Sequence, residues 1–276
     1  MLKDILVALT DTDGDRAALA LAATIAQPFR AKVAALVTVQ LGHPAAFEWR
    51  AMPASVYAEI VSMERERGEA LAARTREALK AVDDAEVRIA ESMLPVRMVA
   101  ALHARHADLA VVAAPVGDTR DLMEDLAVDL LMQSGRPVLV VPPDHVRRER
   151  PLHAVIAWQP RREAARAVHD ALPLLGTFAT VDVLMVDPQT RETGHGEQPG
   201  ADIAAHLARH GLCVNVVTLP RMGDTVEICI LRHVVESGAD LVVAGGYSHT
   251  RFREQILGGV TRTLLQGCPV PVLLSH

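Results

Sequence analysis

Aromatic residues are scarce in this sequence: they make up 3% of its 276 residues, although half of the residues are hydrophobic. The hydrophobic core therefore has to be built from Ala, Val, Leu and Ile. That composition favours helices stacked on a buried parallel sheet over an aromatic-rich β-sandwich. A chain of this length also accommodates two domains of about 140 residues each.

Lysine is scarce too, with Lys3, Lys32 and Lys80 as the only lysines among 28 basic residues, and the net charge is -6. The sequence has no long basic run and no basic patch interleaved with aromatic residues, so we expect no nucleic-acid partner. No apolar run is long enough to span a membrane, and the N-terminus lacks the pattern of a signal peptide. We therefore expect a soluble, cytoplasmic protein without a membrane partner.

The sequence contains few residues with the spacing that catalytic or metal sites require. Cys213, Cys229 and Cys268 form no C-x-x-C pair, which argues against a disulfide framework or a thiolate zinc site. Asp202, His206 and His210 follow one another at four-residue spacing on one predicted helix face, a geometry compatible with a divalent metal. Because no further ligand is evident, we favour a solvent-facing helix and assign no metal. We also assign no catalytic residue, since no G-x-S-x-G elbow is present.

An internal repeat sets the predicted architecture. The segment that begins with Ala107-Asp108-Leu109 recurs 132 residues later at Ala239-Asp240-Leu241, and 134–138 recurs at 266–270 with the same offset. Two separated matches at one spacing indicate a duplicated unit. We place the first domain at 1–143, with an extra segment at about 42–84, and the second at 152–276. A charged stretch bracketed by prolines, 143–152, is the predicted linker.

Short β-branched runs alternate with helical patterns in both halves, as is typical of βαβ units around a parallel sheet. The predicted fold class is α/β: two tandem Rossmann-like domains, each with a five-stranded, mostly parallel sheet flanked by helices. The predicted strands are 4–10, 32–39, 86–92, 108–114, 137–141, 153–158, 180–186, 213–218, 240–245 and 270–274. The predicted helices are 14–27, 55–82, 97–106, 120–134, 161–174, 200–210, 224–237 and 257–266. Pro269 and Pro271 predict an edge position for the last strand.

The segment DLVVAGGYSHTRFREQILGGVTRTLLQGCPVPVLLS, residues 240–275, resembles the last strand-loop-helix-strand of the universal stress protein family. The resemblance implies an adenine nucleotide alpha hydrolase-like domain whose loop has the form G-x2-G-x9-G-[ST]. Here Gly245, Ser248, Gly258 and Gly259 stand at the four positions. Glycines serve such a loop because backbone N–H groups must approach phosphate closely, and a helix N-terminus supplies further donors.

The resemblance implies ATP as the candidate ligand and a site in the second half. The expected ligand-binding residues follow the strands and continue through the last loop: Trp158, Gln159, Val186, Gly245, Gly246, Ser248, His249, Arg251, Gly258, Gly259, Val260 and Thr261. Two positions depart from the family pattern. Gly259 lacks the side-chain hydroxyl that the family uses to bind phosphate. Trp158-Gln159 replaces the usual acidic residue, and the Trp158 indole either stacks on a ring or fills the pocket. The first half keeps Asp11 and Asp13 there but lacks the glycine series.

The predicted function is that of a tandem universal stress protein: a stress-response binding and signalling module with weakened or lost ATP binding, rather than an enzyme. The alternative is an ATP-binding member with slow ATP hydrolase activity that uses the second loop. The family resemblance also implies that the last strands of the two halves meet across a pseudo-twofold axis, so that the two domains pair within one chain, with a homodimer as a further possibility. Protein partners cannot be named. The 42–84 segment, which includes Trp49, is open to three interpretations: a lid, a contact surface, or a loop packed by its own side chains.

Overall fold

The computed structural model describes residues 1–42, 53–117, 120–146, 151–190, 197–246 and 259–276. The first half alternates strands and helices in the order β1 Asp4–Ala8, α1 Gly14–Phe29, β2 Lys32–Gln40, α3 Ala54–Ala78, β3 Ala85–Ser92, α4 Val96–Ala104, β4 Leu109–Ala113, α5 Arg120–Gln133 and β5 Val138–Val141. The second half repeats the alternation as β6 His153–Ala157, α6 Arg162–Leu175, β7 Thr180–Val186, α7 Ala201–Arg209, β8 Val214–Leu219, α8 Val226–Ser237, β9 Leu241–Gly245, α9 Gly259–Gly267 and β10 Val272–Ser275. The predicted α/β fold is confirmed.

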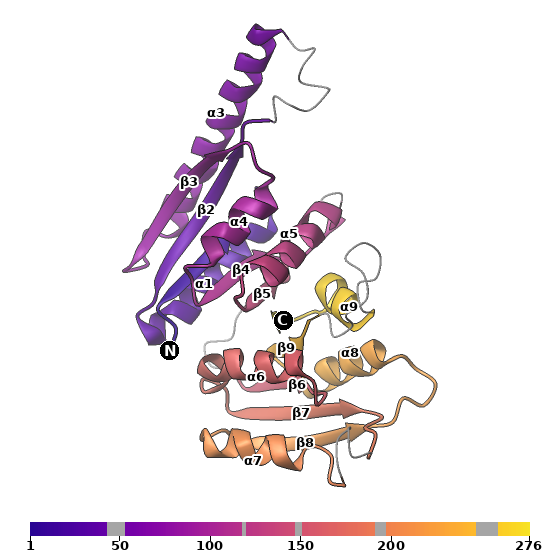
Figure 1. Cartoon of the computed structure of the whole chain (residues 1–276). Coiled ribbons are helices and arrows are strands. Elements are labelled where there is room, and N and C mark those ends of the chain that lie inside the picture. Colours follow the sequence, from indigo (N-terminus) through magenta and orange to yellow (C-terminus); the bar gives the residue numbers. More distant parts are fainter. Residues whose placement is uncertain (43–52, 118–119, 147–150, 191–196, 247–258) are drawn as a thin grey trace.

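All ten strands join one sheet, in the order β3-β2-β1-β4-β5-β10-β9-β6-β7-β8. Each half contributes five parallel strands in the same internal order, as its first strand pairs with both its second and its fourth. In Figure 1 the two halves lie end to end, with α3 and α7 at opposite ends of the molecule. The central strands of the first half are buried along their length because helices cover both faces of the sheet.

The halves join through the only antiparallel pairing in the described sheet, between β5 and β10, where Leu139 stands opposite Leu273. The prediction that the last strand is an edge strand is wrong, since β10 lies between β5 and β9 in the middle of the sheet. Pro269 and Pro271 precede the strand, which begins at Val272, so neither removes an N–H donor from the strand pairings. The carbonyl oxygen of Pro271 still accepts a hydrogen bond from Val242.

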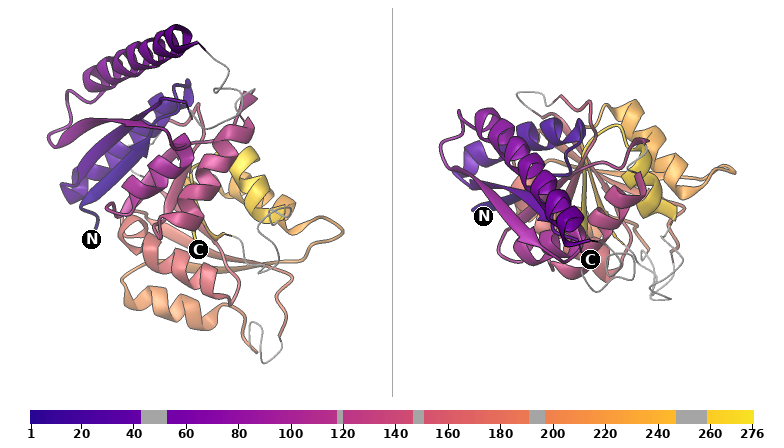
Figure 2. Two further views of the ribbon diagram at one scale, coloured as in Figure 1. Left: turned by 45° about the horizontal axis from the view of Figure 1, so that its top comes forward. Right: turned by 90° about the horizontal axis from the view of Figure 1, so that it is seen from above.

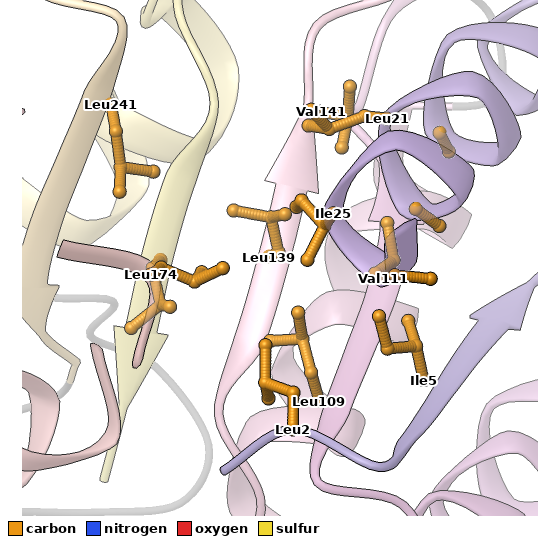
Figure 3. Close-up of a cluster of buried hydrophobic side chains, with 14 of the residues drawn as sticks. Leu2, Ile5, Leu21, Ile25, Leu109, Val111, Leu139, Val141, Leu174 and Leu241 are labelled. Atoms are coloured by element: carbon orange, nitrogen blue, oxygen red, sulfur yellow. The ribbon is translucent and has the colours of Figure 1, made fainter. Parts of the chain in front are cut away.

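Hydrophobic side chains form one cluster on each face of the sheet, and each cluster contains residues of both halves. One face is covered by α1, α3, α6 and α7, and the other by α4, α5, α8 and α9. Figure 3 shows the first cluster at the junction, where Leu139 of β5 lies between Ile25 of α1 and Leu174 of α6. The core is therefore continuous across the two halves, and each half shields apolar surface of the other.

Helix α3 lies at one end of the molecule (Figure 1). Helix α3, with 25 residues, packs beside β2 and β3 and extends beyond the sheet (Figure 2). Within the described ranges, none of the helices combines the length and the hydrophobicity needed to cross a bilayer. Phe47 and Trp49 of the 42–84 segment fall outside the described residues.

Candidate functional site

A cavity of about 290 Å³ lies at the carboxyl ends of β6, β7 and β9, with the first turns of α6, α8 and α9 around it. This is where the strand order of the second half reverses, because β6 runs between β7 and β9. Chain connections leave in opposite directions at such a point, so a crevice forms there, and ligands of open α/β sheets bind in it. The volume is at the lower end of the range of small-molecule sites, about 300 to 1,000 Å³.

The structure brings together seven of the ligand-binding residues expected from the sequence. Those that line the cavity are Trp158, Gln159, Val186, Gly245, Gly259, Val260 and Thr261. Gly246 is not among the lining residues and lies at the junction with the first half. Ser248, His249, Arg251 and Gly258 lie outside the described residues.

Trp158 forms part of the cavity wall directly after β6. Its backbone N–H donates to the carbonyl of Leu184 at 2.8 Å, which continues the pairing of β6 with β7 one residue beyond the strand. The half-buried indole packs against the core cluster on the α6 face and also faces the cavity. The space that remains beside the indole shows that Trp158 lines the pocket without filling it, and leaves an aromatic surface for a planar ring.

Gly245, the last residue of β9, is explained by packing. A Cβ at this position would lie 2.6 Å from the backbone nitrogen of Ala164 and 2.7 Å from the carbonyl carbon of Glu163, at the start of α6. The first half shows the same close approach, with the glycine on the helix instead: a Cβ at Gly14 would lie 2.8 Å from the Cβ of Ala113, at the end of β4. The glycine at 245 thus follows from the contact between strand and helix, whether or not phosphate binds.

Gly246 serves the contact between the halves. Within the second half, its N–H donates to the carbonyl of Ser275 at 2.8 Å, and its carbonyl lies 3.1 Å from Nδ1 of His276. A Cβ on Gly246 would meet the Cδ2 atom of Leu131, on α5 of the first half, at 2.5 Å. The residue that the sequence places in the ligand loop is therefore packed against the other half of the chain.

Sequence reasoning missed two carboxylates that line the cavity, Glu163 in the first turn of α6 and Glu227 in the first turn of α8. Both occupy the N-terminal turn of a helix that follows a strand, so both stand at the carboxyl edge of the sheet. Acidic side chains are favoured there because the helix dipole presents partial positive charge. The predicted helix starts and the strand order, taken together, would have predicted both carboxylates at this edge.

Glu163 is buried, and Nε of Arg162 donates to its Oε1 at 2.5 Å. Burial alone would raise the pKa of this carboxyl, but the hydrogen bond from Arg162 and the charges of Arg162 and His276 outweigh burial, so the pKa is lowered. Glu163 is therefore ionised at neutral pH, and Arg162 balances its charge.

Glu227 lies against the start of α9. The position that a Cβ on Gly259 would take is 3.3 Å from Oε1 and 4.0 Å from Oε2 of this carboxylate. Helix α9 has no acidic residue in its own first turn. The carboxylate of Glu227 thus supplies negative charge at the N-terminal end of α9 from a neighbouring helix.

The corresponding corner of the first half is occupied by its own side chains. Asp11 follows β1 and forms ion pairs at 2.7 Å with Arg67 and Arg74 of α3, which tie the corner to that helix. Asp15 is buried and accepts hydrogen bonds from Thr10; burial raises its pKa despite those bonds. Asp13 stands at the N-terminus of α1 without a side-chain capping bond.

The other candidate residues from the sequence, His206, His210 and Cys268, do not line the cavity. His206 and His210 lie edge to face with ring centres 4.8 Å apart, and no group of three or more His, Cys, Asp or Glu side chains among the described residues is arranged to hold a metal ion. Cys268 is buried, and this raises the pKa of its thiol to about 11. The thiol is therefore protonated and unreactive at neutral pH.

Comparison with known proteins relates the second half of the chain to one family. A sequence model of the universal stress protein family matches residues 154–276, while no curated protein sequence matches the chain. A universal stress protein from Archaeoglobus fulgidus DSM 4304 is 16% identical, with 99% of this chain and 96% of that chain covered and a TM-score of 0.74. A protein of unknown function from Pseudomonas aeruginosa PAO1 is 15% identical over 99% and 92%, with a TM-score of 0.60. Residues 154–276 therefore carry the sequence pattern of the universal stress protein family, and the whole chain shares the fold of these solved structures.

Proposed function

We propose that this protein is a stress-response binding module whose second half binds the nucleoside part of a nucleotide, and that its binding of ATP is weakened or lost. The observation that carries the proposal is the cavity at the reversal of strand order, with an indole and apolar side chains in its wall, in the half of the chain that the family's sequence model matches. The module would act in the cytoplasm, through protein partners that respond to occupancy of the cavity.

The lining supports a ring-binding site more strongly than a phosphate-binding site. Val186, Val226 and Ile230 contribute apolar surface to the lining, and Gln159 and Thr261 contribute polar side chains. This combination is typical of sites that enclose a planar ligand and orient it with a few polar groups. At the phosphate end the family's hydroxyl is replaced by Gly259, and the carboxylate of Glu227 lies beside that glycine. These features weaken the contribution of phosphate to binding.

The proposal is tested by thermal unfolding with millimolar adenosine and with millimolar Mg-ATP, since a ligand that binds only the folded state raises the melting temperature. We expect a rise with adenosine and a smaller rise, or none, with Mg-ATP. Mass spectrometry of the purified protein would identify a nucleoside or nucleotide carried through purification. Release of phosphate from Mg-ATP would instead favour the slow hydrolase.

A pair of variants separates binding in the cavity from binding elsewhere. Val186→Trp places a large side chain in the cavity and should abolish the rise with adenosine. Val216→Trp makes the same change on β8, where the side chain is 45% exposed and does not line the cavity, and should keep the rise. No rise in the wild-type protein with either ligand, or an equal rise in both variants, would contradict the proposed site.

A further inference from the structure

The two carboxylates in the cavity differ in how their charge is balanced. Glu163 receives a hydrogen bond from the Arg162 guanidinium. Glu227 forms no ion pair or hydrogen bond with any residue in the part of the chain that the structure describes. Its half-buried side chain therefore brings to the cavity wall a negative charge that no described residue pairs directly, while Arg161 brings a positive charge to the same lining.

The position of this charge matters because of what surrounds it. Gly259 and Val260 begin α9 and line the cavity, and the N–H groups at the start of a helix have no partners within it. These groups and the helix dipole attract an anion, and a phosphate group of a ligand would be one. Both oxygens of Glu227 lie within 4.0 Å of the Cβ position at Gly259, so the carboxylate stands where such a phosphate would approach.

We infer that Glu227 sets the ligand class of this site: the cavity takes an uncharged nucleoside and rejects its phosphorylated forms. This inference rests on the proposed function, because it concerns the same cavity, and it assigns the selectivity to one residue. A carboxylate accepts hydrogen bonds from hydroxyl and amine groups, which a nucleoside offers. A phosphate offers mainly acceptor oxygens and a like charge, and two like charges placed side by side in an interface oppose binding.

The experiment is isothermal titration of the full-length chain with adenosine and with adenosine monophosphate, which differ only by the phosphate. Three proteins are compared: wild type, Glu227→Gln and Glu236→Gln. Glu227→Gln keeps the size of the side chain and removes its charge. Glu236→Gln makes the same change at an exposed position near the other end of α8, away from the cavity, and serves as the matched control.

Wild type should bind adenosine at least about tenfold more tightly than the monophosphate, as expected for like charges in close contact. Glu227→Gln should tighten monophosphate binding by about tenfold or more and leave adenosine binding within about threefold. Glu236→Gln should behave as wild type. Because the selectivity is a ratio between two ligands on the same protein, a partial loss of folded protein would not imitate it.

Two results would overturn the inference and leave the proposed function intact. One is equal affinity of wild type for both ligands, which would mean that the positive charge of Arg161 in the lining outweighs Glu227. The other is an unchanged preference for adenosine in Glu227→Gln. If neither ligand binds any of the three proteins, the proposed function and the inference fall together.

Discussion

Replacing Gly245 with alanine tests whether this glycine is present for packing or for a ligand. The added Cβ would lie 2.6 Å from the backbone nitrogen of Ala164, whereas ordinary contacts begin at 3.4 Å. Helix α6 or strand β9 would have to move by about 0.8 Å to restore contact. Because the obstacle is backbone, no side-chain rotation relieves the clash.

The magnitude follows from the cost of overpacking a core, about 1 to 3 kcal/mol, and a backbone obstacle places Gly245→Ala at the upper end. The lower entropy of the unfolded chain returns about 0.4 to 1 kcal/mol. We expect the free energy of unfolding to fall by about 2 kcal/mol, which corresponds to a drop in melting temperature of roughly 4 to 8 °C. Urea unfolding followed by circular dichroism measures the first quantity, and a thermal scan measures the second.

Gly267→Ala is the matched control, because a Cβ on Gly267, the last residue of α9, meets nothing within 4 Å. It should leave stability unchanged or raise it by up to about 1 kcal/mol. Gly246→Ala should cost less than Gly245→Ala, since its obstacle is the flexible end of the Leu131 side chain. If Gly245→Ala is as stable as wild type but loses ligand binding, the packing explanation is refuted and the glycine belongs to the binding site.

Two further predictions concern stability. Leu139→Ala removes a buried side chain from the junction of the halves and should lower the free energy of unfolding by about 2 to 5 kcal/mol. The control Leu102→Ala, at a side chain that is 42% exposed, should change this free energy by less than about 0.5 kcal/mol. Equal effects of the two substitutions in urea unfolding would contradict the continuous core. The pKa of Asp182 is lowered because hydrogen bonds from Asn215, His233 and His153 outweigh the effect of burial. The ionised Asp182 therefore stabilises the fold above its unfolded pKa of 3.8, and this stabilisation is lost as the pH falls through the lower folded pKa. Asp182→Asn should be less stable than wild type at neutral pH but should lose less stability on acidification. An equally steep loss of stability in acid for both proteins would refute this assignment.

Local patterns in the sequence were sufficient to predict the elements of the fold. The strand predicted at 86–92 is β3 Ala85–Ser92, and the helix predicted at 120–134 is α5 Arg120–Gln133. These elements are set by periodicity and by the turn residues between them, which act over a few neighbouring residues. The edge assignment of the last strand failed because the position of a strand in a sheet depends on pairing partners. The partner of β10 lies in the other half, with Leu139 opposite Leu273, and no local pattern records that pairing.

The site was predictable as far as strand ends define it. Trp158 and Val186 follow or end predicted strands, and both line the cavity. Glu227 was missed because its place in the cavity depends on the approach of α8 to the start of α9, two elements separated by a strand. Gly246 stays a predicted residue of the ligand loop, but the sequence cannot show that Leu131, more than a hundred residues earlier, packs against it.

Helix α9 connects the candidate site to the first half of the chain. Its first residues, from Gly259 to Thr261, line the cavity, and further along the same helix Nε2 of Gln266 donates to Oε2 of Glu124, a buried residue of α5, at 2.5 Å. Figure 2 shows α9 beside α5, across the junction. The first half therefore contacts the helix whose first residues line the candidate site, even though its own corner is occupied by Asp11 and two arginines. This contact and the shared sheet tie the candidate site to both halves of the chain.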